Sequence, residues 1–196
     1  MDITIELSCI TYICVRNSHM DINWEIRDSA QLSYELVTSD NYLKILDIFT
    51  EDEHPFVSES YKERKKLKVY FDNMEKLRRS KSKYAGQEWM VYHRADQKYI
   101  GIVSLYDLST EEYNDNNQRC TLGFAIHTAY RRKGYGSEAV KALIHYAKHS
   151  LGRPLALAYT HDSNPASKKI LTKLGFQDVT GQYICGPDIR YFGLGE

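Results

Sequence analysis

Hydrophobic and polar positions along the chain follow two different periods, and the changes between them predict the order of the elements. From residue 32, alternating apolar residues predict a strand at 32–37. Apolar residues then recur at helical spacing, which predicts a helix at 41–49 with Asp40 as its cap, followed by a longer helix that begins at Ser58 or Ser60. The first third of the chain is therefore expected to be a strand followed by two helices.

The remaining pattern predicts a hairpin, a strand, a helix, a strand, a short helix and a second hairpin. In that order, the expected ranges are 88–94 with 99–107, 119–127, 137–149, 155–161, 165–174, and 176–184 with 189–194. Gly175 stands where a glycine commonly ends a helix. No internal repeat interrupts this order.

The first 28 residues differ from this regular part. Apolar residues alternate with polar ones in two short stretches, Ile3 to Leu7 and Ile22 to Ile26, and a turn near Asn17 would join them as two strands. We therefore expect residues 1–28 to form an N-terminal extension, with an extra hairpin as its simplest structure. A single domain would then occupy residues 29–196.

Composition narrows the classes of function. The 196 residues include 26 basic and 26 acidic side chains, so the formal charge of zero gives no support to a general nucleic-acid binder. The basic residues between 62 and 83 are interleaved with acids and fit a solvated helix face. Cysteines and histidines lack the spacing of a metal site, and no stretch resembles a secretory signal or a membrane span. We expect a cytoplasmic protein without a metal or a membrane partner.

The turn at 131–136 carries the strongest candidate chemistry. It follows a predicted strand, contains Gly134 and Gly136, and leads directly into an amphipathic helix. The first N–H groups of a helix lack internal partners and can donate to phosphate oxygens, while glycine lets a ligand approach the backbone. Further donors around the turn come from Arg131, Arg132, Lys133 and Ser137. A diphosphate suits this set, although an ordinary turn with exposed basic residues fits the spacing equally well.

The strand before this turn favours a ligand. One of its faces is bulky, and the other carries the small residues Gly123 and Ala125 beside Thr121. Glycine within a strand often marks a bulge or the close approach of a ligand. An extended chain that bears amides, such as the pantetheine arm of coenzyme A, could lie against this face and bond to the strand backbone.

These residues resemble a known family. Arg131-x-x-Gly134-x-Gly136 matches the Q/R-x-x-G-x-G/A signature of the GNAT superfamily of N-acetyltransferases. The surrounding residues 123–140 look like the branch that contains the RimJ/RimL-type ribosomal-protein N-terminal acetyltransferases. A second stretch, Asn164-Pro165-Ala166-Ser167 followed by Leu174-Gly175-Phe176, resembles that branch at a compatible spacing. The resemblance is specific over 119–176 and follows the order of elements from residue 32 onward.

The resemblance implies an α/β (α+β) fold with a mixed, mostly antiparallel, twisted sheet flanked by helices. Two central parallel strands, at 119–127 and 155–161, would splay apart and hold the thioester of acetyl-CoA between them. Strand backbone would bind the pantetheine arm, and the backbone of 132–137 would bind the pyrophosphate. The cofactor-binding residues expected on this basis are Phe124, Ala125, Ile126, Arg131, Arg132, Lys133, Gly134, Tyr135, Gly136, Ser137 and Asn164.

The expected reaction, attack of a neutral amine on the thioester, needs a proton acceptor for the amine and a proton donor for the thiolate. Many family members use a Tyr five positions before the Phe of the G-F pair, but that position is Leu171 here. In the RimL-like branch a Ser in N-x-x-S takes this role, which makes Ser167 the candidate acid. A purely cofactor-binding Ser167 is the alternative, and Tyr159 is a second candidate. No base stands out among Asp107, Glu111, Glu112 and His161.

The sequence thus predicts an acetyl-CoA-dependent N-acetyltransferase that acts through a ternary complex. Its acceptor would be a primary amine, either a protein N-terminus or a small molecule, and the chain would act as a monomer or a homodimer. The missing Tyr keeps open an alternative of another class, a non-catalytic acyl-CoA-binding domain that serves as a sensor or scaffold.

Overall fold

The computed structural model describes residues 23–80, 86–108 and 118–195, and its elements follow the predicted order. The strands are β1 (Leu32–Leu36), β2 (Gln87–His93), β3 (Lys98–Tyr106), β4 (Arg119–Ile126), β5 (Leu155–His161), β6 (Gln177–Asp178) and β7 (Ile189–Leu194). The α-helices are α1 (Lys44–Phe49), α2 (Arg64–Arg79), α3 (Tyr135–His149) and α4 (Pro165–Lys173). Short 3-10 turns occur at η1 (Glu59–Tyr61), η3 (Thr128–Tyr130) and η4 (Thr180–Gln182). None of the described helices is long and apolar enough to cross a membrane.

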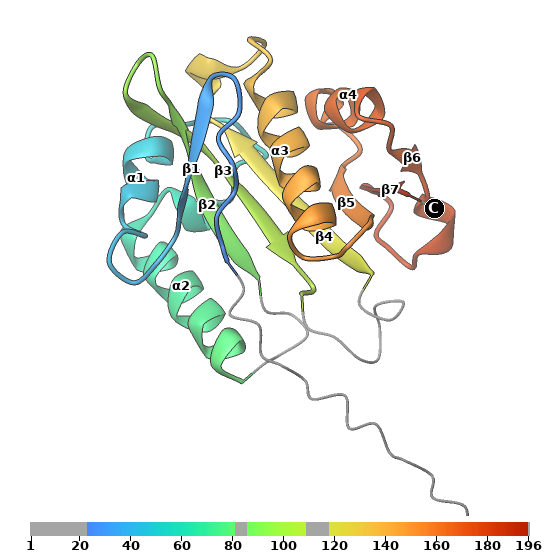
Figure 1. Ribbon diagram of the computed structural model, residues 1–196, viewed down its shortest axis with the longest axis horizontal. Coiled ribbons are helices and arrows are strands. Elements are labelled where there is room, and N and C mark those ends of the chain that lie inside the picture. Colours follow the sequence, from blue (N-terminus) through green and yellow to red (C-terminus); the bar gives the residue numbers. More distant parts are fainter. Residues whose placement is uncertain (1–22, 81–85, 109–117, 196) are drawn as a thin grey trace, which may run out of the picture.

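The strands form one mixed sheet in the order β1-β2-β3-β4-β5-β7-β6 (Figure 1). β4 and β5 are parallel, and every other neighbouring pair is antiparallel. The helix that follows β4 returns the chain to the edge of β5, as a parallel pair requires a crossover connection. The predicted fold class, a mostly antiparallel sheet with one central parallel pair and flanking helices, is confirmed.

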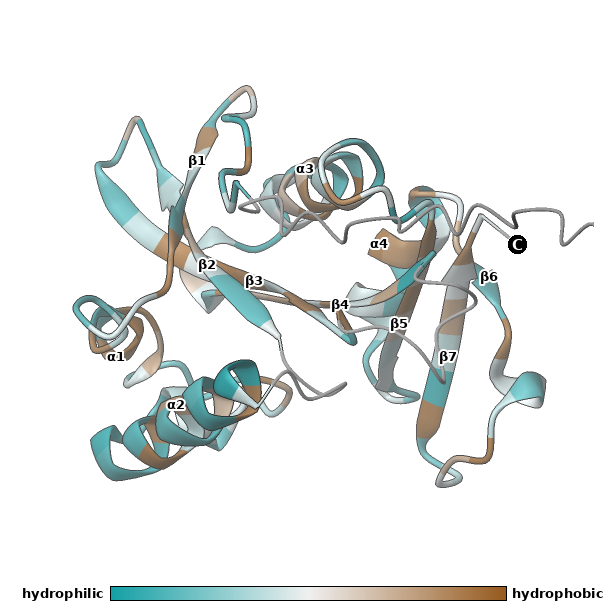
Figure 2. Ribbon diagram, turned by 60° about the horizontal axis from the view of Figure 1, so that its bottom comes forward, coloured by the Kyte–Doolittle hydropathy of each residue, from teal (hydrophilic) through white to brown (hydrophobic). Residues whose placement is uncertain are grey.

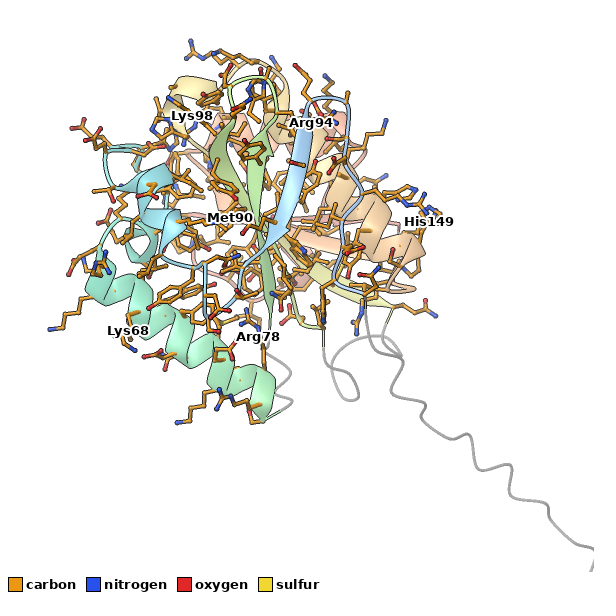
Figure 3. All side chains as sticks on the ribbon, turned by 60° about the vertical axis from the view of Figure 1, so that its left-hand side comes forward. Lys68, Arg78, Met90, Arg94, Lys98 and His149 are labelled. Atoms are coloured by element: carbon orange, nitrogen blue, oxygen red, sulfur yellow. The ribbon has the colours of Figure 1, made fainter. Side chains whose placement is uncertain are left out.

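Helices pack on both faces of the sheet, and the buried cluster is smaller on one face than on the other (Figure 2). Helices α3 and α4 pack on one face, over a buried cluster that includes Trp89, Leu143 and Phe176. Helices α1 and α2 pack on the other face, over a smaller cluster that contains Phe49 and Met90 (Figure 3), whereas the charged side chains of α2 face solvent. We refer to these as the α3 face and the α2 face.

The residues of β4 divide between the two faces as their alternation predicts. Cys120 and Leu122 are buried in the cluster on the α3 face, with Phe124 packed against it. Ala125 packs against the cluster on the α2 face. Gly123 lies on the α2 face as well, so small residues occupy that side of β4.

Several boundaries differ from the predicted ones for local reasons. Helix α1 begins three residues later than expected, since the side chain of Asn41 bonds to the backbone of Thr38 and Leu36 and holds a turn there. Asp40 therefore caps no helix. The hydroxyl of Ser58 accepts from the backbone of Ser60 and starts η1, and α2 follows only after Glu63.

The end of α4 follows the prediction closely. Gly175 adopts a φ of +90°, and the backbone N–H of Phe176 donates to the carbonyl of Leu171 at 3.1 Å. The N–H of Gly175 donates to Thr172 at 3.0 Å, which completes a Schellman motif. Leu171 and Phe176 are both buried in the cluster on the α3 face. The predicted last hairpin is present but shorter, because β6 contains only two residues.

Of the N-terminal extension, residues 1–22 lie outside the described residues. Residues 23–28 form no strand, in contrast to the prediction, but they pack on the domain. The indole of Trp89 donates to the carbonyl of Trp24 at 2.8 Å, and the hydroxyl of Tyr146 donates to that of Asn23 at 2.8 Å. Ile26 of the same segment is buried in the core. Backbone carbonyls of the segment thus serve as acceptors for side chains of the domain.

Candidate functional site

The central parallel strands separate partway along their length. β4 and β5 are paired from Arg119 and Leu155 as far as Leu122 and Ala158. Beyond that point β4 stays bonded to β3 and β5 stays bonded to β7. Among the described residues, the facing edges of 123–126 and 159–161 therefore have no strand partner. We call this opening the β4–β5 gap, and it confirms the predicted splay.

The loop between β4 and α3 has an unusual backbone. Arg132 adopts a φ of +61° and Gly134 a φ of +92°, both in the left-handed region that non-glycine residues rarely occupy. Left-handed residues in a turn direct successive N–H groups toward one point and form concave anion sites. Gly134 is also the N-cap of α3, and no side chain of the described residues caps that helix. The loop thus presents free helical N–H groups beside the gap.

The two glycines of the loop have different roles. At Gly134 an added Cβ would meet no described atom within 4 Å, so only its dihedral angle requires glycine there. At Gly136 an added Cβ would lie 2.9 Å from Cδ1 of Ile170 in α4. Gly136 therefore allows α4 to approach the first turn of α3, which places the N-termini of both helices on the same side of the gap.

The cationic side chains of the loop point in different directions. Arg132 and Lys133 are exposed and could reach a phosphate. Arg131 turns inward, where its Nε donates to the carbonyl of Ile126 at 2.7 Å, and burial lowers the pKa of its guanidinium. Tyr135 is buried against His93, with ring centroids 4.7 Å apart. Within the predicted set, the side chains of Arg131 and Tyr135 therefore support the loop from within the protein.

A buried carboxylate that the sequence analysis did not identify holds the loop in place. Asp52 is 2% exposed and accepts from both the backbone N and the Oγ1 of Thr128, at 3.0 and 2.7 Å. It also accepts from the N–H of His54 at 2.9 Å and lies 3.8 Å from Nη2 of Arg131. Its sequence context, an acidic turn after a helix, gives no signal that separates it from an exposed loop residue.

Helix α4 carries the second predicted motif. The side-chain oxygen of Asn164 accepts from the backbone N of Ser167 at 3.2 Å and caps the helix, with Pro165 as its first residue. The amide oxygen of Asn164 is thus used within the protein, which leaves its NH₂ group for a ligand. Ser167 lies half-buried in the first turn of α4.

The other candidate side chains lie around the α2 face of the gap. Tyr159 is 58% exposed and follows the last residue of β5 that pairs with β4, with its ring 5.8 Å from that of Tyr191. The ring of His161 lies 5.6 Å from that of Phe56. Asp107 accepts from Oγ1 of Thr121 at 2.5 Å. Glu111 and Glu112 lie outside the described residues.

A second buried carboxylate, also missed by the sequence analysis, lies on the α2 face. Glu88 of β2 is 1% exposed, and its Oε1 accepts from the hydroxyls of Tyr61, Tyr70 and Tyr106 at 2.7, 2.6 and 3.2 Å. We call these four residues the Glu88 cluster. Burial and the negative charge of Glu88 raise the pKa of all three tyrosines. The sequence does show a charged residue within a predicted strand, but the alternation of apolar and polar residues predicts that such a residue faces solvent.

A groove with a volume of about 1210 Å³ lies elsewhere, between residues 23–30 and α3. It is lined mainly by exposed polar side chains, including His145 and His149. No three His, Cys, Asp or Glu side chains gather as a metal site within the described part of the chain. The unpaired strand edges and the left-handed loop beside them make the β4–β5 gap the candidate site.

Comparison with known proteins agrees with this geometry. The family model described as "Acetyltransferase (GNAT) domain" matches residues 23–177. An uncharacterized N-acetyltransferase of Bacillus subtilis, YoaA, is 28% identical over 101 residues, which cover 50% of this chain and about half (54%) of that relative.

Solved structures share the fold at low sequence identity. A ribosomal-protein-S5-alanine acetyltransferase from Vibrio fischeri superposes with a TM-score of 0.64 and 19% identity, covering 85% of this chain and 94% of that one. A spermidine N-acetyltransferase chimera from Vibrio cholerae and hSSAT gives 0.63 and 13%, covering 84% and 95%. The ribosomal L7/L12 acetyltransferase RimL, solved with coenzyme A, gives 0.61 and 14%, covering 86% and 96%.

The family model spans most of the chain, and its match includes the splayed strands, the left-handed loop and the capped N-terminus of α4. The chain belongs to the GNAT family of acetyltransferases, and it shares its fold with RimL and with the ribosomal-protein-S5-alanine acetyltransferase.

Proposed function

We propose that this protein transfers the acetyl group of acetyl-CoA to a primary amine, in a ternary complex and without a covalent intermediate on the protein. The observation that carries the proposal is the end of β4–β5 pairing at Leu122 and Ala158, immediately before a loop with two left-handed residues. This arrangement offers an unpaired strand edge and a set of free N–H groups in succession. An amide-bearing arm that ends in a diphosphate has the matching acceptors and donors.

The residues present fit acetyl-CoA. Backbone groups of 124–126 face the gap and suit the pantetheine amides. The N–H groups of the loop and of the first turn of α3 suit the pyrophosphate, with Arg132 and Lys133 as exposed cations beside it. The amide of Asn164 suits the arm, since its oxygen is already used in the cap of α4.

Two proton transfers accompany the reaction. The thiolate that leaves needs a proton, and we assign Ser167 as its donor because its hydroxyl lies half-buried in the first turn of α4. The amine attacks only after it has lost a proton, so the protein or a water molecule must accept one. An N–H group at the unpaired edge of β4 would stabilise the oxyanion.

Two acceptor classes are consistent with the fold. The names of structural neighbours describe one that acetylates a ribosomal-protein alanine and one that acetylates spermidine. Both acceptors present a primary amine that is mostly protonated at neutral pH. We therefore propose a primary amine as the acceptor and treat a peptide N-terminus and a small polyamine as the two arms of the test.

Release of free thiol from acetyl-CoA tests the function directly. The full chain is incubated with acetyl-CoA and, in turn, with peptides that have a free or a blocked N-terminus and with small amines. We expect thiol release that depends on a free primary amine, with acetylated product detected by mass spectrometry. Tight acetyl-CoA binding without release for any amine would instead support the non-catalytic acyl-CoA-binding domain.

Substitution of Ser167 separates its two roles. If the hydroxyl protonates the thiolate, Ser167→Ala lowers kcat by about 10²-fold while the Kd of acetyl-CoA stays within about twofold. Ser163→Ala is the matched control, because Ser163 lies just before the same helix and its hydroxyl contacts Nδ1 of His161 at 2.6 Å. A change confined to the Kd would make Ser167 a cofactor contact only.

A further inference from the structure

Within the described part of the chain, no cation pairs with the carboxylate of Glu88. Its Oε1 accepts from three neutral hydroxyls, and its Oε2 is buried without a hydrogen-bond partner among the described residues. Burial of an ionised carboxylate is costly unless a cation or sufficient donors compensate it. Natural cores rarely leave such an atom unsatisfied, and exceptions often mark sites that act on a ligand. The described residues therefore supply no cation to the cluster.

The cluster is connected to the β4–β5 gap by the register of the sheet. Glu88 of β2 lies opposite Ser104 of β3, which lies opposite Gly123 of β4, and all three side-chain positions face α2. Gly123 follows Leu122, the last residue of β4 that pairs with β5. With neighbouring strands about 4.8 Å apart, this row spans about 10 Å from the buried carboxylate to the edge of the gap.

Tyr106 fills the space along this row. An added Cβ on Gly86 would lie 2.3 Å from Cδ1 of the Tyr106 ring, and an added Cβ on Gly123 would lie 3.2 Å from its Cε2. Oγ of Ser104 lies closer still to that position on Gly123, at 2.3 Å, so the ring of Tyr106 and the hydroxyl of Ser104 lie together beside β4. Its hydroxyl contacts Oε1 of Glu88 at 3.2 Å and the hydroxyl of Tyr70 at 3.1 Å.

We propose that Glu88 accepts the proton of the acceptor's ammonium group through the hydroxyl of Tyr106, which makes Glu88 the general base of the transfer. The inference rests on the proposed function and adds to it the proton acceptor that the sequence did not reveal. It also defines the acceptor: a primary ammonium group, the cation that the described residues do not supply.

The proton transfer balances as follows. The ammonium N–H bond breaks and its proton passes to the oxygen of Tyr106, while the hydroxyl proton of Tyr106 passes to the carboxylate of Glu88. The freed lone pair forms the N–C bond to the thioester carbon, and the C–S bond then breaks. The second proton leaves nitrogen as the amide forms, and the thiolate takes up one proton. The complete reaction therefore releases one proton to solvent.

The surroundings of Glu88 suit this role. Among the described residues, the titratable groups that bond to it are Tyr61 of η1, Tyr70 of α2 and Tyr106 of β3. Arg78 of α2 bonds to Glu75 and to the carbonyl of Gly86. Because burial and Glu88 raise the pKa of these tyrosines, they stay neutral at physiological pH and pass a proton on without becoming anions.

Replacement of the carboxylate by its amide tests the assignment. For a strongly basic amine at pH 7, we expect Glu88→Gln to lower kcat/KM at least about 100-fold, since general bases contribute 10²–10⁴-fold. The deficit shrinks as pH rises toward the pKa of the amine, and it is at least tenfold smaller for trifluoroethylamine, which is already neutral at pH 7. The Kd of acetyl-CoA stays unchanged. An equal loss for both amines, or no loss, overturns the assignment.

A second pair of variants keeps the test decisive if Glu88→Gln does not fold. Tyr106→Phe retains the ring and removes the relay, so it gives the same dependence on pH and on the basicity of the amine. Tyr146→Phe removes another buried hydroxyl, which donates to Asn23 at 2.8 Å, and it retains the wild-type profile. A wild-type profile for Tyr106→Phe overturns the relay. Absence of amine-dependent thiol release by the unmodified chain overturns the proposed function as well, whereas active wild type with unchanged variants overturns only the role of Glu88.

Discussion

The loop that opens α3 and the Glu88 cluster are two polar sites built in different ways. The loop uses backbone, with left-handed dihedral angles at Arg132 and Gly134, and it is continuous in sequence. The Glu88 cluster uses side chains, which come from η1, α2, β2 and β3 and meet only in the folded sheet. One site is open to solvent, and the other is closed over a carboxylate that is 1% exposed.

The difference shows what each site can tolerate. A backbone site depends on dihedral angles and is insensitive to most side-chain changes that preserve them. A side-chain site depends on a few hydroxyl and carboxylate oxygens, and each substitution there removes a group directly. Donor binding and amine turnover should therefore respond to separate sets of substitutions, and the first two of the three predictions below test this separation.

The largest expected effect is that of Gly134→Val on acetyl-CoA binding. A left-handed backbone costs a non-glycine residue about 1–2 kcal/mol, and more for a β-branched one, so the loop relaxes and its N–H groups diverge. We expect the Kd of acetyl-CoA, measured by calorimetry, to rise at least about tenfold. Gly152→Val is the matched control, because Gly152 has a φ of +66° and also has open space beside it. It should lose stability and keep its affinity; equal losses of affinity would contradict a local role for Gly134.

A smaller effect is expected from Gly86→Ala, which acts on the other site. The added methyl group would meet the ring of Tyr106 at 2.3 Å and the carbonyl of Leu105 at 2.9 Å, so the ring must move. Overpacking of this kind costs about 1–3 kcal/mol. We expect kcat for amine acetylation to fall about tenfold with an unchanged Kd for acetyl-CoA. A raised Kd with normal kcat would mean that the two sites are not separate.

The smallest expected effect concerns the pH dependence of stability. Glu138, in the first turn of α3, is partly desolvated, but donors from Gln31 and Ser29 outweigh this and lower its pKa. A depressed pKa adds stability that is present above the ordinary glutamate value of about 4.3 and is lost as pH falls through the folded value. The exposed site limits this to below about 1 kcal/mol. In urea unfolding, Glu138→Gln should be less stable than wild type at pH 6 and equal to it near pH 3; a constant difference would contradict this.

The sequence predicted the fold and the loop because both depend on local patterns. Strand alternation placed Cys120 and Leu122 on one face, and the glycine spacing located the left-handed turn before the helix. The roles of Asp52 and Glu88 were missed for the same physical reason. Each is a charged residue whose partners lie far away in the chain, and a hydrophobic pattern cannot distinguish a buried carboxylate with donors from an exposed one. The inward turn of Arg131 was missed because a sequence motif does not record side-chain direction.

The position of Asp52 has a consequence for the order of events in the reaction. This residue belongs to the connection between α1 and η1, which borders the α2 face, yet its oxygens hold Thr128 at the base of the loop that opens α3. A ligand that orders this connection therefore also orders the loop, and thermodynamic reciprocity requires the loop's ligand to favour the connection by the same factor. Asp52 therefore joins the connection between α1 and η1 to the base of the loop that opens α3 through one buried side chain.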